Sequence, residues 1–185
     1  MSVGAGRLRG RRLAVAEGSR PSSGRIRAAL FSIWGERLAG AELLDLFAGS
    51  GGVGIEAWSR GARAVTLVEN GQRALAVIRR NADLVAEAGA ARVLALPVER
   101  ALERLAAEGR LFDLVFADPP YELRLGERFF RLARRVAGRG TSLAIEHRAS
   151  TPPADETPGW SLRASRRHGD STLRFYEPDG EGSAV

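Results

Sequence analysis

Apolar and polar positions alternate along the chain in blocks that predict strands and helices in turn. Short apolar runs, typical of buried strands, lie near residues 42–47, 64–69, 92–97, 111–117 and 140–147. Stretches with helical spacing of apolar residues lie between them, near residues 53–60, 71–88, 99–107 and 124–137. Two further runs, at 160–168 and 171–177, predict a hairpin around Gly169 and Asp170. Regular alternation of strands and helices predicts an α/β fold with a parallel sheet and right-handed crossovers.

The predicted strand at 111–117 ends in the unusual run Asp118, Pro119, Pro120 and Tyr121. The Asp118 carboxylate can accept a hydrogen bond from the exocyclic amine of a flat ring. The two prolines lack an N–H and have a fixed φ, so their carbonyls are rigid acceptors. Tyr121 offers a π-face on which a base can stack. An ordinary strand followed by a Pro-Pro turn would account for the same residues without a ligand.

A glycine-rich loop follows the strand near 42–47. Glycine allows a positive φ and lets a ligand approach the backbone closely. Glu69 ends the next strand about 20 residues after Gly49, where a carboxylate is well placed to hold both hydroxyls of a ribose. Residues 49–54 also match the dinucleotide pattern G-x-G-x-x-G, which leaves an NAD-linked oxidoreductase open. That alternative lacks an evident hydride-handling residue, so we predict a nucleoside site of another kind.

Together the two segments resemble the class I S-adenosylmethionine-dependent methyltransferases. Asp118–Tyr121 looks like the [N/D]PP[Y/F] motif of enzymes that methylate exocyclic amines of nucleobases. The N-terminal region resembles the bacterial 16S ribosomal RNA guanine-N2 methyltransferases of the guanine(966)-N(2) type, which have a GRxL…RPTxxRxRExLFN pattern. The resemblance extends from about Gly10 to Tyr176. It is carried by residues 10–13, 20–31, 45–51, 56–57, 59–62, Asn81 and 168–173.

This resemblance implies a Rossmann-like methyltransferase fold: a seven-stranded, mostly parallel sheet with an antiparallel C-terminal hairpin and a short N-terminal extension. It divides the chain into a basic, RNA-facing arm and helix over 1–37, a donor-binding catalytic domain over 38–177 and a disordered tail over 178–185. The implied reaction transfers a methyl group from S-adenosyl-L-methionine to the N2 amine of a guanine in 16S ribosomal RNA. The implied substrate is an assembled or assembling small subunit. An adenine-N6 methyltransferase and a non-catalytic RNA-binding module remain alternatives.

The resemblance also assigns roles in donor binding. Glu69 should hold the ribose hydroxyls, and the glycine loop should pack against the methionine portion, with Asp45 near its amino group. Relatives often have Asp or Asn after the third strand to contact adenine, but here Pro97 stands in that stretch. Adenine would then rely on the Val98 backbone, on Glu99 or on apolar packing. The expected donor contacts are Asp45, Phe47, Ala48, Gly49, Ser50, Gly51, Glu69, Asn70 and Val98. The expected catalytic residues are Asp118, Pro119, Pro120 and Tyr121.

Charge points to a polyanionic partner. The net charge is +6, the pI is about 11.1, and all 28 basic residues are arginine. Codon bias in a GC-rich genome accounts for the choice of arginine, but not for its crowding near the N-terminus. We expect RNA contacts from Arg11, Arg12, Arg20, Arg25 and Arg27.

The remaining composition narrows the class of protein. With no cysteine and only two histidines, we expect no disulfide, no thiol nucleophile and no metal site. No apolar run approaches the roughly 18 residues needed to cross a membrane, and no apolar h-region follows the basic N-terminus. We therefore expect a cytoplasmic monomer without a membrane partner.

Overall fold

Seven strands and five α-helices make up the computed structural model, which describes residues 1–16, 24–85, 89–120 and 122–180. The strands are β1 (Glu42–Leu46), β2 (Ala64–Glu69), β3 (Ala91–Ala95), β4 (Phe112–Ala117), β5 (Ala137–Arg148), β6 (Trp160–His168) and β7 (Ser171–Pro178). The helices are α1 (Gly24–Trp34), a 3-10 turn η1 (Gly35–Leu38), α2 (Gly52–Ser59), α3 (Gln72–Ala82), α4 (Val98–Ala107) and α5 (Glu127–Arg134).

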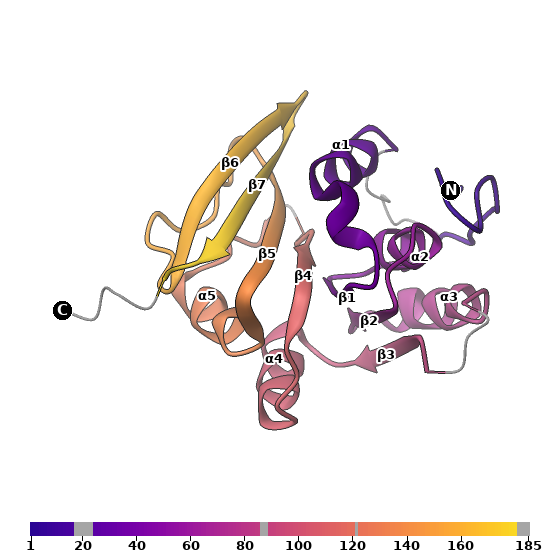
Figure 1. The fold of residues 1–185 in the computed structure, drawn as a ribbon, viewed down its shortest axis with the longest axis horizontal. Coiled ribbons are helices and arrows are strands. Elements are labelled where there is room, and N and C mark those ends of the chain that lie inside the picture. The colour runs from indigo at the N-terminus through magenta and orange to yellow at the C-terminus, as the bar shows by residue number, and fades with distance from the viewer. Residues whose placement is uncertain (17–23, 86–88, 121, 181–185) are drawn as a thin grey trace.

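One sheet holds all seven strands, in the order β3-β2-β1-β4-β5-β7-β6 (Figure 1). The first five strands run parallel, and β7 pairs antiparallel with both β5 and β6. This confirms the predicted mostly parallel sheet with an antiparallel C-terminal hairpin. The strand order reverses between β1 and β4, where open α/β sheets bind their ligands.

Helices cover both faces of the sheet. Side chains of α1, α2 and α3, such as Leu30, Ile55 and Ile78, pack on one face. Side chains of α4 and α5, such as Leu102 and Phe130, pack on the other. Because both faces are covered, the central strands are apolar at successive positions rather than at alternate ones.

Several predicted boundaries differ from the structure. The helix predicted over 71–88 is α3, which ends at Ala82, while residues 86–88 lie outside the described part of the chain. The helix predicted to reach 137 ends at Arg134, and β5 begins at Ala137. Residues 8–16, whose sequence could form a strand or a hairpin arm, form no strand, and Arg12 makes an isolated antiparallel bridge with Ser2.

The N-terminal arm is fastened to α2 by hydrogen bonds around Ser59. The amides of Arg7 and Leu8 donate to the carbonyl and hydroxyl oxygens of Ser59, each at 2.8 Å, and the Ser59 hydroxyl donates to Ala5 O at 2.7 Å. Gly6 has a φ of 81°, and a Cβ there would lie 1.9 Å from Ser59 O. Only glycine therefore permits this close approach.

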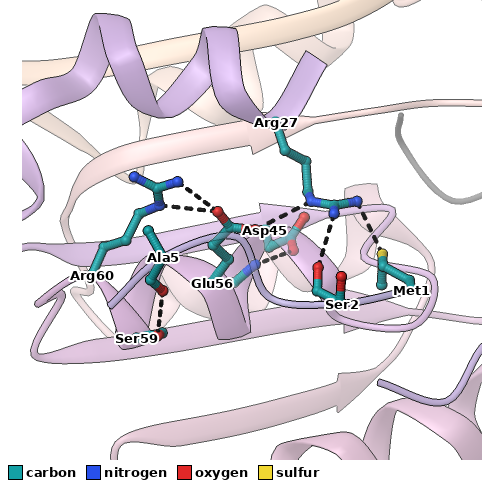
Figure 2. A network of polar contacts seen from close by, with 9 residues as sticks. Met1, Ser2, Ala5, Arg27, Asp45, Glu56, Ser59 and Arg60 are labelled. Carbon is teal, nitrogen blue, oxygen red and sulfur yellow. Dashed lines mark hydrogen bonds and ion pairs between the residues drawn. The ribbon is translucent and has the colours of Figure 1, made fainter. Parts of the chain in front are cut away.

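A buried ion pair joins the arm, α1 and α2 (Figure 2). Arg27 Nε lies 3.3 Å from Glu56 Oε2, and Arg60 Nη2 lies 2.7 Å from Glu56 Oε1. Arg27 also donates to Ser2 O at 3.1 Å, and only 8% of the residue is exposed. The expectation that Arg27 contacts RNA is therefore wrong: its guanidinium points inward, where its charge is balanced by Glu56.

Replacing Glu56 with alanine should destabilise the fold strongly, because it removes the carboxylate that balances Arg27 and Arg60 in a buried site. We expect a loss of about 3–5 kcal/mol in the free energy of unfolding, measured by urea titration. The control is Glu127→Gln, which breaks the exposed Glu127–Arg131 pair and should cost less than about 1 kcal/mol. Equal losses in the two variants would show that the Glu56 pair does not anchor the arm.

Candidate active site

The two segments singled out in the sequence meet at the carboxyl edge of the sheet. Strands β1 and β4 are parallel neighbours, with Leu46 opposite Ala117. The chain therefore leaves β1 into the glycine loop beside the point where it leaves β4 into Asp118. The Asp118 amide lies 3.5 Å from Leu46 O, which ties the two exits together.

The glycine loop has a tightly defined backbone. Gly49 and Gly51 have φ values of 55° and 79°, and Phe47 has a φ of 60°, which is unusual for a bulky residue. A Cβ on Gly51 would lie 3.0 Å from Ile78, so the loop requires glycine there. From α3, Asn81 Nδ2 donates to Ser50 O at 2.8 Å and to Ala14 O at 2.9 Å. One buried amide thus holds the loop and the N-terminal arm in fixed relation.

Glu69 is the last residue of β2 and lies at this carboxyl edge of the sheet. Its Oε2 accepts a hydrogen bond from Gly49 N at 2.9 Å, and its Oε1 accepts from Asn70 N at 2.9 Å and Gly71 N at 2.7 Å. A carboxylate has about four lone-pair sites, so Glu69 can hold these amides and still accept a further O–H. The side chain is half-buried and oriented before any ligand arrives.

Asp45 is buried beneath the same loop, with 1% of the residue exposed. Its Oδ2 accepts a hydrogen bond from Gly54 N at 2.9 Å, at the start of α2. The pKa of Asp45 is raised from 3.8 to about 8, chiefly by burial; the Gly54 hydrogen bond opposes this rise, and the charges of Asp118 and Glu69 add to it. Asp45 thus braces the loop, and a cation bound nearby would favour its ionised form.

A cavity of about 640 Å³ opens beside the loop, within the usual range for small-molecule sites. Three of the expected donor contacts line it, namely Phe47, Asn70 and Val98. Sequence reasoning did not find Leu125 and Phe129, which close the apolar side of the cavity. They follow β4 without any recognisable motif, and only the folded chain brings them to Val98.

Residues 118–121, which follow β4, occupy different environments. Asp118 is half-buried, Pro119 is buried, and Pro120 is exposed. Pro120 O accepts a hydrogen bond from Leu123 N at 2.8 Å, which turns the chain after the motif. Tyr121 lies outside the described residues, so its stacking role stays a prediction. Glu146 on β5 was not singled out in the sequence, yet it is buried and lies in register beside Asp118.

The arginines that were expected to contact RNA differ in their exposure to solvent. Arg11 and Arg12 are exposed on the arm, and Arg25 is exposed at the start of α1. Arg20 lies outside the described residues, and Arg27 is buried as described above. Among the described residues, no acid forms an ion pair with Arg11, Arg12 or Arg25. These three guanidinium groups are therefore available to bind phosphate.

Two negative findings concern metal binding and membranes. The described residues contain no cluster of three or more histidines and acids that could bind a metal ion. Within the same residues, no helix has the length and apolar character needed to span a membrane.

The stability of the protein should report the ionisation of Asp45. A carboxyl with a pKa of about 8 in the folded state and 3.8 when unfolded contributes stability that is fully present below the lower value and is lost as the pH rises through the higher one. Asp45→Asn cannot ionise, so its free energy of unfolding relative to the native protein should increase between about pH 5 and about pH 8. Urea titrations at both pH values measure this. A difference that does not change with pH would contradict the assignment.

Comparison with solved structures identifies the fold. The structure of the Escherichia coli protein yhhF matches with a TM-score of 0.83 at 30% sequence identity, covering 97% of this chain and 98% of that chain. The structure of SMU.776, a protein complexed with SAH, matches with a TM-score of 0.65 at 13% identity over 83% of this chain and 48% of that chain. The second likeness shows the fold alone. The expected class I methyltransferase fold is confirmed.

Comparison with protein families and curated proteins identifies the relatives. The family described as Conserved hypothetical protein 95 matches residues 1–177. Ribosomal RNA small subunit methyltransferase D of Escherichia coli (strain K12) is 32% identical over 187 residues, which cover 97% of this chain and 90% of that protein. The chain therefore belongs to the Conserved hypothetical protein 95 family and to the family of ribosomal RNA small subunit methyltransferase D.

Proposed function

We propose that this protein transfers a methyl group from S-adenosyl-L-methionine to the exocyclic N2 amine of a guanine in the 16S ribosomal RNA of the small subunit. The observation that carries the proposal is that Asp118 and the glycine loop leave the sheet side by side where the strand order reverses, and that Phe47 of this loop lines a cavity of nucleoside size. Membership of the methyltransferase D family supports ribosomal RNA as the substrate. We propose that the enzyme acts as a cytoplasmic monomer.

The residues on the donor side fit an adenosine. With three backbone amides already bound, Glu69 would accept a hydrogen bond from one ribose hydroxyl, and Phe47, Pro97 and Val98 would pack against the adenine ring. Pro97 offers no donor, but it is the N-cap of α4, so the Val98 amide belongs to the first turn. Amides of the first helical turn have no intrahelical acceptor, which leaves the Val98 N–H to hydrogen-bond a ring nitrogen. When bound, the donor supplies an electrophilic methyl group on a sulfonium.

The acceptor residues address the weak nucleophilicity of a base amine, whose lone pair is delocalised into the ring. Asp118 and the Pro119 carbonyl would each accept a hydrogen bond from one of the two N–H groups of the amine. These bonds would direct its nitrogen in line with the methyl group. As the N–C bond forms and the C–S bond breaks, the nitrogen gains positive charge, which a fixed carboxylate stabilises. One amine proton is then released to water, which leaves the neutral methylated base and the thioether S-adenosylhomocysteine.

The test is transfer of a labelled methyl group to 30S subunits that lack this modification, followed by nucleoside analysis. Appearance of N2-methylguanosine supports the proposal. N6-methyladenosine would instead establish the adenine alternative, and binding without transfer would indicate a non-catalytic module. Parallel assays with deproteinised 16S RNA show whether the substrate is the naked RNA or the assembled subunit.

Asp118→Ala should impair chemistry while leaving donor binding nearly intact. We expect turnover to fall at least about 100-fold, the usual scale for removing a preorganised electrostatic group. Single-turnover assays measure transfer, and calorimetry with S-adenosylhomocysteine measures donor affinity. The control is Asp113→Ala, because Asp113 is exposed on the same strand and accepts a hydrogen bond from Glu42 N at 2.8 Å, away from the site. Near-normal turnover in Asp118→Ala would contradict the proposed role.

The exposed arginines of the arm should contribute to RNA binding. Replacing Arg11 and Arg12 with alanine is expected to weaken binding to 30S subunits and to reduce the salt slope by about one for each phosphate that is no longer neutralised. Affinity for S-adenosylhomocysteine should not change. A matched double variant at Arg104 and Arg131, which are paired with acids on α4 and α5, removes the same charge and should keep the slope. An unchanged slope in the arm variant would exclude the arm from the RNA surface.

A further inference from the structure

The tip of the β6–β7 hairpin lies at the same edge of the sheet as the active site. Arg148, the last residue of β5, pairs with Ser171, and Ser171 pairs with His168. Because β5 runs parallel to β4, its carboxyl end marks the edge at which Asp118 follows β4. Figure 1 shows the hairpin extending past the end of β4 on the side where that strand ends.

Sheet register connects Asp118 directly to this hairpin. Ala117 lies opposite Ile145, so the next residues, Asp118 and Glu146, are neighbours across the strands. Glu146 pairs with Leu173, and Leu173 pairs with Arg166. Strands are spaced about 4.8 Å apart, so the backbone of Arg166 lies roughly 14 Å from that of Asp118, three strand spacings away. Residues opposite each other in register point to the same face, so Arg166 lies on the same face as Glu146.

The hairpin tip carries exposed positive charge that is not balanced locally. Arg166, Arg167 and His168 are consecutive and exposed. Arg166 Nη1 donates to Ser165 O at 3.0 Å, and Arg167 Nε donates to Gly169 O at 3.1 Å. Both bonds go to carbonyls of the hairpin itself, and no carboxylate within the described part of the chain pairs with either guanidinium. Arg163, nearer the middle of β6, differs because it pairs with Glu177 at 3.1 Å.

We propose that the hairpin tip forms a second RNA-binding surface, with Arg166 and His168 on one face and Arg167 on the other, which holds phosphates of the strand next to the target base. The proposal rests on the proposed function, which places that base at Asp118. Guanidinium groups bind phosphate through paired hydrogen bonds. A span of roughly 14 Å is short on the scale of an RNA strand, so a strand whose base enters the site reaches the hairpin within a few nucleotides.

The location of the hairpin complements that of the N-terminal arm. The arm packs on α2 and α3, which lie over β1, β2 and the edge strand β3, whereas β6 forms the opposite edge of the sheet. Asp118 follows the central strand β4 and therefore lies between the two basic surfaces. RNA bound on both sides of Asp118 would be held with its target base aligned with that residue.

Salt-dependent binding tests the charge of this surface. The double variant Arg166→Gln, Arg167→Gln should bind 30S subunits more weakly and lose up to about two from the slope of log affinity against log salt. Its affinity for S-adenosylhomocysteine should match that of the native protein. Arg163→Gln is the matched control, because it removes an arginine from the same strand that lies outside the tip and already pairs with Glu177, and its slope should not change.

A proximity experiment tests the position of the surface independently of affinity. The chain contains no cysteine, so His168→Cys creates a single attachment site for an iron chelate that generates hydroxyl radicals. We expect strand cleavage within a few nucleotides of the methylated guanine, and weaker cleavage there from the same probe at Arg163→Cys.

The outcomes separate this proposal from the proposed function. If the native protein methylates 30S subunits but both hairpin experiments match their controls, the hairpin surface is excluded and the function stands. Cleavage confined to distant RNA, or crosslinking of the hairpin to a ribosomal protein instead, would also overturn the proposal. If the native protein methylates no RNA, the function and the hairpin surface fall together.

Discussion

Parallel pairing of β1 with β4 is the constraint on which the rest of the site depends. Leu46 opposite Ala117 brings the glycine loop and Asp118 out of the sheet side by side, although they are far apart in the sequence. The reversal of strand order at this point sends the following segments in opposite directions, which leaves room beyond the strand ends for ligands. In the proposed reaction, the donor and acceptor sites are neighbours because two buried strands share a register.

The same pairing concentrates negative charge. Asp45, Glu69 and Asp118 lie close together, and burial, with the charges of the other two carboxylates, raises the pKa of Asp45 to about 8. Backbone amides compensate part of the cost: Gly54 donates to Asp45, and Gly49, Asn70 and Gly71 donate to Glu69. Such an arrangement is poorly suited to a pyrophosphate and well suited to a sulfonium donor and to an amine that becomes positive during transfer.

The sequence predicts most of the fold because local signals agree with the tertiary structure. Apolar runs that end at Asp45–Phe47, Glu69 and Asp118 are strands, and the glycine loop lies where their spacing indicates. Interactions between distant segments could not be read in the same way. Arg27 has the sequence context of a surface arginine, and its burial follows from Glu56, which lies 29 residues away. Nothing in the local sequence marks Leu125 and Phe129 as cavity-lining residues, because they reach the cavity only when α5 packs beside α4. Likewise, the basic hairpin can be placed near Asp118 only from the register of the folded sheet.

We propose that this edge of the sheet holds the nucleoside of a sulfonium donor through Glu69. Calorimetric titration of the native protein and of Glu69→Gln with S-adenosylhomocysteine, and with NADH in parallel, tests this contact. We expect the native protein to bind S-adenosylhomocysteine and not NADH, and the variant to lose about 1–3 kcal/mol of binding free energy, the scale of charge-assisted hydrogen bonds. Tight binding of NADH without any response to S-adenosylhomocysteine, or equal affinity of the two proteins for S-adenosylhomocysteine, would contradict it.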